Sequence, residues 1–247
     1  MKSLYTNGFE QVFDDMYQTF INYQEEFECY SSILLDNNTT SVLEIGCGTG
    51  HLAKLFIDSN LHYKGLDLSQ DMIDISKKRN PTGDFITHNM TTFTLIKPID
   101  SIIITGRTTS YLLDNNTVSK ALKRIHSNLN DDGILCFDFI DASRFFLEIK
   151  DGKSIVHHAA IGEKKYSRES YMKANTTLDN MMFDWEATYY LHTNHQKQHL
   201  ITDISTVRAF TKNEWELFLA LHNFELIDCI DKKSYAFDTY VIVAKKR

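Results

Sequence analysis

The residues best suited to hold a ligand form a glycine-rich run at residues 44–50, Glu-Ile-Gly-Cys-Gly-Thr-Gly. Glycine has no Cβ atom, so a ligand can approach the backbone closely, and the free amides where a helix begins favour a carboxylate or another polar group. A dinucleotide-binding turn needs its third glycine one residue later, where this chain carries His51. The run therefore predicts a cofactor site that does not suit the pyrophosphate of a dinucleotide.

Predicted strands and helices alternate on both sides of this run. Residues 41–47 resemble a short buried strand and residues 51–59 a helix. The alternation continues with strands at 62–68, 83–87, 99–105 and 133–141 and helices at 70–78, 118–129 and 212–222. It predicts a parallel sheet covered on both faces. The last two strands, 224–230 and 236–246, are joined by a polar turn and predict a terminal antiparallel hairpin.

Two segments fall outside this alternation. Residues 9–35 carry apolar side chains at steps of three and four, which predicts an amphipathic helix or helix pair. Between 153 and 209 the period changes to two, and turn signals at Asp179 and Asn180 and at 193–198 divide this insertion into about three antiparallel strands. We expect one domain over 1–247, with a helical cap at 1–36 and an antiparallel insertion at 153–209 that acts as a lid.

Composition excludes some classes of partner. The formal charge of −7 and the pI of about 5.8 argue against a protein that neutralises a nucleic-acid backbone. We find no apolar run long enough to span a bilayer and no secretory segment, so we expect no membrane partner and a cytoplasmic location. The four cysteines lack Cys-x-x-Cys spacing and are interpreted as reduced packing residues.

The spacing Glu-x-Gly-x-Gly-x-Gly at 44–50 resembles the first motif of class I S-adenosylmethionine (SAM)-dependent methyltransferases. Further motifs extend the resemblance over about residues 9–145, and the pattern R-x-F-T-x-x-E-W at 208–215 with the closing hairpin extends it to the last forty residues. The chain is most similar to small-molecule N- or O-methyltransferases of the glycine and amino-sugar N-methyltransferase type. The resemblance implies SAM as cofactor and a doubly wound, Rossmann-like α/β fold with a seven-stranded sheet.

The resemblance also implies which residues contact SAM. Asp67 ends the second predicted strand, where a carboxylate can accept bonds from both ribose hydroxyls. The family places an apolar residue beside the adenine, which Leu68 or Met72 can supply, although Met72 also suits a core position. The family commonly has Asp where this chain has Asn89, whose carbonyl can still accept the adenine amino hydrogen. The implied cofactor residues are Glu44, Gly46, Cys47, Gly48, Gly50, Asp67, Leu68, Met72, Asn89, Met90 and Thr105.

Acceptor residues are implied less specifically. Arg107 and Tyr111 follow Thr105 in the loop that lines the acceptor pocket of the family, and Arg107 either binds an acidic group or pairs with a surface carboxylate. Tyr17 lies on the cap and is the candidate base, against the alternative that it is a core aromatic residue. Trp185 and Tyr189 share one face of the insertion. The histidines of the insertion lack metal spacing, so no metal site is expected.

These observations favour methyl transfer to a nitrogen or oxygen of a small molecule, driven mainly by alignment and the exclusion of water. Two other functions stay open: a non-catalytic SAM-binding sensor or partner subunit, since all the motifs concern the cofactor, and, less favoured, a dinucleotide-dependent oxidoreductase. The identity of the acceptor, the need for a base and the choice between monomer and homodimer are also open.

Overall fold

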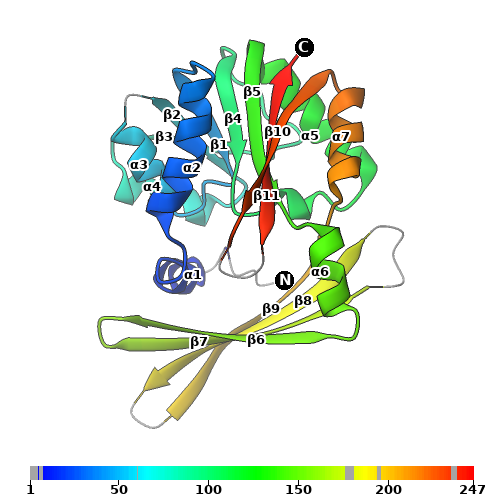
Figure 1. Ribbon diagram of the computed structural model, residues 1–247. Coiled ribbons are helices and arrows are strands. Elements are labelled where there is room, and N and C mark those ends of the chain that lie inside the picture. Colours follow the sequence, from blue (N-terminus) through cyan, green and yellow to red (C-terminus); the bar gives the residue numbers. More distant parts are fainter. Residues whose placement is uncertain (1–4, 6–7, 60, 176–180, 194–195, 235–237) are drawn as a thin grey trace.

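A seven-stranded sheet forms the centre of the molecule (Figure 1). The computed structural model describes residues 5, 8–59, 61–175, 181–193, 196–234 and 238–247. The strand order is β10-β11-β5-β4-β1-β2-β3. Strand β11 runs antiparallel to both of its neighbours, β10 and β5, and the other pairs are parallel. The strands are β1 (Ser41–Ile45), β2 (His62–Asp67), β3 (Asp84–Thr87), β4 (Ile99–Ile104), β5 (Leu129–Phe139), β10 (Phe224–Lys232) and β11 (Thr239–Lys246). The predicted Rossmann-like sheet with a terminal antiparallel hairpin is confirmed.

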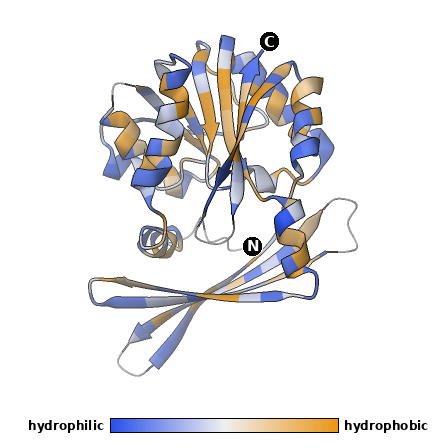
Figure 2. Cartoon of the chain, in the orientation of Figure 1, coloured by the Kyte–Doolittle hydropathy of each residue, from blue (hydrophilic) through white to orange (hydrophobic). Residues whose placement is uncertain are grey.

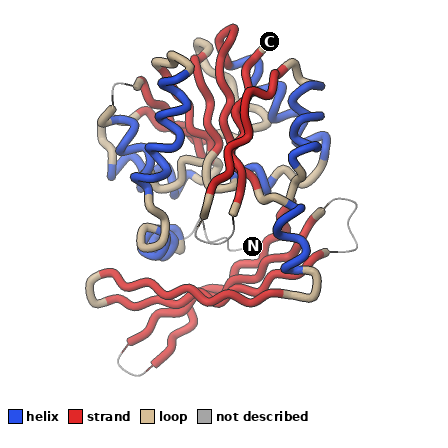
Figure 3. The backbone as a smooth tube through the Cα atoms, in the orientation of Figure 1, coloured by secondary structure: helices blue, strands red, loops and turns tan. Residues whose placement is uncertain are grey.

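Helices cover both faces of this sheet (Figure 3). Adjacent residues of β1 enter different cores, because side chains alternate along a strand: Val42 packs with one set of helices and Leu43 with the other. Both faces are apolar, as buried parallel strands require, and Figure 2 shows hydrophobic residues concentrated in the central strands. One set is α2 (Tyr23–Asp36), α3 (His51–Ile57) and α4 (Gln70–Arg79), and the other is α5 (Asn115–Asn128) and α7 (Lys212–Leu221).

A second, separate sheet of four antiparallel strands follows β5, and we call it the small sheet. Its strands are β6 (Lys153–Ile161), β7 (Lys164–Ala174), β8 (Met182–Thr193) and β9 (Gln196–Arg208). The prediction of about three strands is wrong, because Gly162, with φ of +56°, makes a tight turn between β6 and β7. The predicted turn residues Asp179 and Asn180 lie outside the described residues.

Helix α6 (Ala142–Ile149), which the periodicity does not predict, joins β5 to the small sheet. The Asp141 carboxylate caps it by accepting a bond from the Ser143 amide. Its buried face packs with small-sheet residues such as Met172 and Phe183. The helix therefore fixes the small sheet against the central domain at one end.

The predicted cap consists of two helices. The first, α1 (Glu10–Tyr17), packs by its apolar face on the small sheet, and α2 begins where Asn22 accepts a bond from the Glu25 amide. A short 3-10 helix, η1 (Thr108–Tyr111), follows β4. Within the described part of the chain, no helix is long and apolar enough to cross a membrane.

Candidate functional site

The carboxyl ends of β1, β2, β3 and β4 meet at one edge of the central sheet, the usual ligand side of an open α/β fold. In Figure 1 this edge faces the small sheet, and α1 lies beside the space between them. A cavity of about 480 Å³ occupies that space. It is lined by loops of the sheet edge, by α1, by η1 and by the small sheet.

The glycine-rich loop takes backbone angles that favour glycine. Gly46, Gly48 and Gly50 all have positive φ, between +53° and +81°. A Cβ atom on Gly46 would lie 2.5 Å from Thr108 Oγ1, whereas one on Gly48 would meet no protein atom within 4 Å. Gly48 lines the cavity, so its missing side chain leaves space for a ligand there. The Cys47 side chain is buried in the core, and its amide and carbonyl are bonded to Leu66 and Gly50, so Cys47 contributes mainly to the shape of the loop beside a smaller, adjacent cavity.

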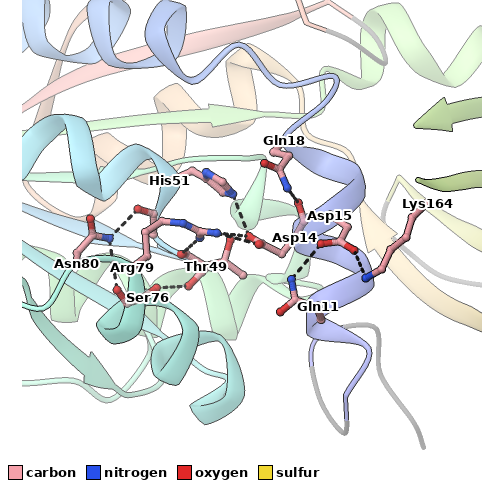
Figure 4. A network of polar contacts seen from close by, with 12 residues as sticks. Gln11, Asp14, Asp15, Gln18, Thr49, His51, Ser76, Arg79, Asn80 and Lys164 are labelled. Carbon is pink, nitrogen blue, oxygen red and sulfur yellow. Dashed lines mark hydrogen bonds and ion pairs between the residues drawn. The ribbon is translucent and has the colours of Figure 1, made fainter. Parts of the chain in front are cut away.

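Helix α4 holds the outer part of this loop (Figure 4). Ser76 Oγ donates to the carbonyl of Gly48 at 2.7 Å, and Asn80 Nδ2 donates to that of Gly50 at 2.9 Å. The Arg79 guanidinium donates to the Thr49 carbonyl. The loop is therefore fixed before any ligand binds, which lowers the entropy lost on binding.

Asp67 links the end of β2 to the same loop. Its carboxylate accepts bonds from the amides of Gly48 and Ser69, each at 2.9 Å. Burial raises the pKa of Asp67 above its ordinary value, while these amide bonds act in the opposite direction. Because a carboxylate has about four acceptor positions, capacity is left for two hydroxyls.

Glu44 is buried at the end of β1 beside a second cavity of about 340 Å³. The hydroxyls of Tyr63 and Thr105 donate to its two oxygens at 2.6 and 2.8 Å. Burial nevertheless raises the pKa of Glu44 to about 7. The two cavities share Gly46, Gly48 and Thr105 as walls, so a single ligand on the loop can reach both.

The residues expected beside an adenine ring line the larger cavity together. Leu68 is exposed and Met72 is buried, which fits both its core and its ligand-facing interpretations. Asn89 and Met90 follow β3 on the opposite wall. Asn89 Oδ1 already accepts bonds from the amide and hydroxyl of Thr91, so a ligand there would share this oxygen.

The loop after β4 brings Arg107 and Tyr111 to the cavity. Arg107 is buried, lines both cavities and has a φ of +61°, an angle that is uncommon outside glycine. Its amide donates to Asp138 Oδ1 at 2.6 Å, which holds the loop in this conformation. The Tyr111 hydroxyl is 2.8 Å from that of Tyr5, a residue that sequence analysis did not select.

The far wall of the cavity belongs to α1 and the small sheet. Trp185 and Tyr189 lie on it, as expected, and Arg168 lies between their rings and that of Tyr17. Arg168 Nη1 donates to the Tyr17 hydroxyl at 2.9 Å. The strand register puts Asp203 opposite Ala187, on the same face. The two ends of the cavity therefore differ, because the sheet-edge end includes bare glycine backbone, whereas the small-sheet end is made of side chains from several strands.

Known proteins share part of the sequence and the fold. Residues 42–133 match a family model described as a methyltransferase domain. An uncharacterized methyltransferase of Oceanobacillus iheyensis is 35% identical over 123 residues, which cover 47% of this chain and 55% of that protein. The chain spans about half the length of the first curated relatives it matches.

Two solved structures share the fold over the whole chain. A sugar N-methyltransferase from Streptoalloteichus is 18% identical with a TM-score of 0.81, covering 100% of this chain and 97% of that one. A SAM-bound amino pentose methyltransferase from Micromonospora echinaspora is 17% identical with a TM-score of 0.80, covering 100% of both chains. The whole chain therefore shares the fold of these two methyltransferases, and residues 42–133 match the methyltransferase domain.

Sequence analysis missed three polar residues of the small-sheet wall, namely Arg168, Asp203 and Ser205. The period of two in β8 was recognised, but the partners of that strand were not. In the observed register Arg168 pairs with Tyr189, and Ser205 pairs with Trp185. Because paired residues project to the same face, the register would have identified all three.

Proposed function

We propose that this chain binds SAM at the sheet-edge half of the larger cavity and transfers the methyl group to an amine of a small polar acceptor. The observation that carries the proposal is that one cavity is lined both by Asp67 and Asn89 and by Arg168 and Asp203. In such a cavity a cofactor and an acceptor can lie in contact while the small sheet, acting as a lid, excludes water. Alignment and the exclusion of water together can remove several kcal/mol of the barrier.

The residues at the sheet edge suit SAM in shape and in hydrogen bonding. The open space over Gly48 admits a ligand against the backbone, and Asp67 has acceptor positions left for ribose hydroxyls. Leu68 and Met72 offer apolar contact to an adenine. Glu44, beside the smaller cavity, would hold the amino group of the methionine part. When bound, SAM supplies an electrophilic methyl group on a sulfonium.

The charges of the acceptor half favour a polar acceptor. Arg107 and Arg168 are buried there and Asp203 is half-buried. Among the described residues that line this cavity, Trp185 has an indole Nε1 that is buried without a hydrogen-bond partner, so a donor remains for an acceptor. An acceptor with an amine and oxygen substituents would use both the donors and the Asp203 carboxylate.

Two of the tyrosines that line this cavity, Tyr5 and Tyr189, are poor bases, which favours nitrogen over oxygen as the nucleophile. Burial raises the pKa of the Tyr5 and Tyr189 hydroxyls well above its usual range, so neither is ready to take a proton from an alcohol at neutral pH. An amine that has lost its proton needs no strong base. Asp203 can orient the ammonium form before that loss. The N-methyltransferase activity named for the sugar N-methyltransferase of the same fold agrees with this choice.

A metabolite panel tests the proposal directly. The purified chain is incubated with SAM and paired acceptors, amino sugars and amino acids against their hydroxy analogues, and release of S-adenosylhomocysteine is measured. We expect release with one or more amines and none with the matched hydroxy compounds. Release with the hydroxy compounds alone would identify an O-methyltransferase and refute the nitrogen assignment.

Calorimetry separates the remaining functions. Binding of SAM without turnover across the panel would favour a sensor or partner subunit, and binding of NAD in place of SAM would contradict the cofactor. We further expect a small-molecule acceptor and no nucleic-acid substrate. We also expect a cytoplasmic enzyme, because all four cysteines are free thiols.

A further inference from the structure

Helix α1 carries two adjacent buried carboxylates that point to opposite sides (Figure 4). Asp14 faces the glycine-rich loop, and Asp15 faces the small sheet. Neighbouring residues of a helix are about 100° apart, so one helix can contact two bodies in this way. Buried carboxylates are rare unless they are paired, and both of these are.

The Asp14 side is an ion-pair cluster at the cofactor loop. Arg79 Nη2 lies 3.0 and 2.8 Å from its two oxygens, and His51 Nε2 lies 2.9 Å from Oδ1. Burial alone would raise the pKa of Asp14, but hydrogen bonds from His51, Arg79 and Thr49 hold the pKa well below its usual range. Arg79 also donates to the Thr49 carbonyl, so the residue that holds Asp14 holds the loop as well.

The Asp15 side joins α1 to the small sheet. Asp15 Oδ2 accepts from the Tyr166 hydroxyl at 2.7 Å and from Lys164 Nζ at 3.3 Å, both on β7. Apolar residues of α1, including Met16, form one core with residues of the small sheet, including Tyr189. Helix α1 and the small sheet therefore form one packed unit, and Asp14 links that unit to the cofactor loop.

We propose that Asp14 and Asp15 are positioning residues that couple the cofactor loop to the small sheet through α1, so that cofactor binding orders the acceptor wall. The proposal rests on the function proposed above. Phe13 and Ile21, on and after α1, line both cavities, so the position of α1 sets the shape of each. A ligand bound on the Gly48–Gly50 backbone adds contacts to the loop that Arg79 already holds, and through Arg79 and Asp14 it further stabilises the position of α1. Such coupling is reciprocal, so an acceptor on the small sheet should tighten cofactor binding equally.

Hydrogen exchange read by mass spectrometry tests the coupling, with S-adenosylhomocysteine as the probe. The variants are Asp14→Asn, Asp15→Asn and the conservative Asp14→Glu. The matched control is Asp58→Asn, which removes an exposed carboxylate paired with Lys54 at the end of α3. Each protein is measured without ligand and at saturating ligand, and calorimetry gives the dissociation constant.

In wild type and Asp58→Asn, we expect the probe to slow exchange in the loop, in α1 and in the small sheet. In Asp14→Asn the loop should still be protected at saturation, but protection of α1 and the small sheet should be lost, with binding weakened roughly tenfold. Asp15→Asn should keep the wild-type affinity and the protection of α1 while reducing protection of β7. Asp14→Glu should restore part of the protection, which a merely structural role does not predict.

Several results would overturn the coupling. In one, the small sheet of Asp14→Asn is protected from exchange at saturating probe as strongly as that of the wild type. In another, the bound probe does not slow exchange in the small sheet of the wild type. If the wild type does not bind the probe, the proposed function and the coupling both fail. The contact of Asp14 with the cofactor loop is tested without ligand. Exchange of α1 should then be faster in Asp14→Asn than in Asp58→Asn, and equal exchange rates would refute a role of that contact in holding α1.

Discussion

The two halves of the larger cavity are built by different means. At the sheet edge three glycines, Gly46, Gly48 and Gly106, line the cavity with backbone alone, beside a few side chains such as Asp67. Opposite them the wall consists of side chains from α1, η1 and the small sheet, including Tyr17, Tyr111 and Arg168. A backbone site tolerates changes of side chain, whereas a side-chain site changes with each substitution.

This difference explains how one fold can serve many acceptors. The sheet edge is fixed by the strand ends and by α4, so it keeps a common cofactor. The small sheet is an insertion whose exposed strand positions can vary without disturbing the central core. If the comparison is right, substitutions in the two halves should affect different kinetic constants.

The largest expected effect is at the glycine loop. Gly48→Val should weaken SAM binding roughly a hundredfold or more, about 3 kcal/mol, because the branched side chain fills the ligand space and resists a φ of +53°. Gly162→Val is the matched control, since Gly162 has a φ of +56° and equally open surroundings in the β6–β7 turn. Calorimetry that gave equal SAM affinities for the two variants would refute the assignment of the loop.

Glu44 should give the sheet edge a pH-dependent stability. Its pKa is about 7 in the folded chain and 4.5 ordinarily, so between these values the folded state keeps a proton that the unfolded state has lost. The free energy of unfolding should therefore be highest below pH 4.5 and fall by about 3 kcal/mol as the pH rises to 7, from this residue alone. Glu44→Gln should remove that contribution. Urea unfolding of both proteins across this range measures the difference, and parallel profiles would contradict the assignment.

Asp67→Ala should weaken SAM binding by about 1.5 to 3 kcal/mol, because it removes charge-assisted bonds to the ribose. The same change frees the Gly48 amide, so Asp67→Asn, whose carbonyl can still accept that amide, should lose less. Asp84→Ala, at an exposed position on neighbouring β3, is the control. Equal calorimetric affinities in folded Asp67→Ala and wild type would exclude the ribose role.

Sequence patterns predicted the central fold because its signals are local. The alternation of buried strands and amphipathic helices identified all seven strands of the central sheet, and the polar turn identified the hairpin. The division of the small sheet failed at Gly162, where a single glycine between an apolar run and charged residues is a weak turn signal. Helix α6 was missed because no glycine or proline separates it from the buried strand β5, so its apolar residues resemble a continuation of that run.

Site residues were predictable to the degree that they are contiguous. Residues 44–50 form one motif, so type and spacing sufficed to select them. Arg168 and Asp203 lie 35 positions apart and face the same cavity only through the register of three strands. That register depends on long-range pairing, which a single sequence does not encode locally.

The smallest effect we predict separates the two halves most directly. Arg168→Gln should raise the Michaelis constant for the amine found in the metabolite panel roughly tenfold, about 1.4 kcal/mol, because a buried guanidinium on the acceptor wall is lost. The dissociation constant for SAM should stay within a few-fold, since the sheet edge holds the cofactor. Arg168→Lys should recover little, because an ammonium lacks the planar fork that spans Tyr17 and the cavity.

Lys173→Gln provides the control for this last experiment, since it removes a cation from the outward face of the same strand, where the side chain is exposed. Steady-state kinetics with the acceptor varied at saturating SAM should distinguish the two variants, with Lys173→Gln matching wild type. A role limited to folding would instead lower the stability of Arg168→Gln and leave the Michaelis constant unchanged. That result would remove Arg168 from the acceptor site and, with it, the main cationic contact of the small sheet with oxygen substituents of the acceptor.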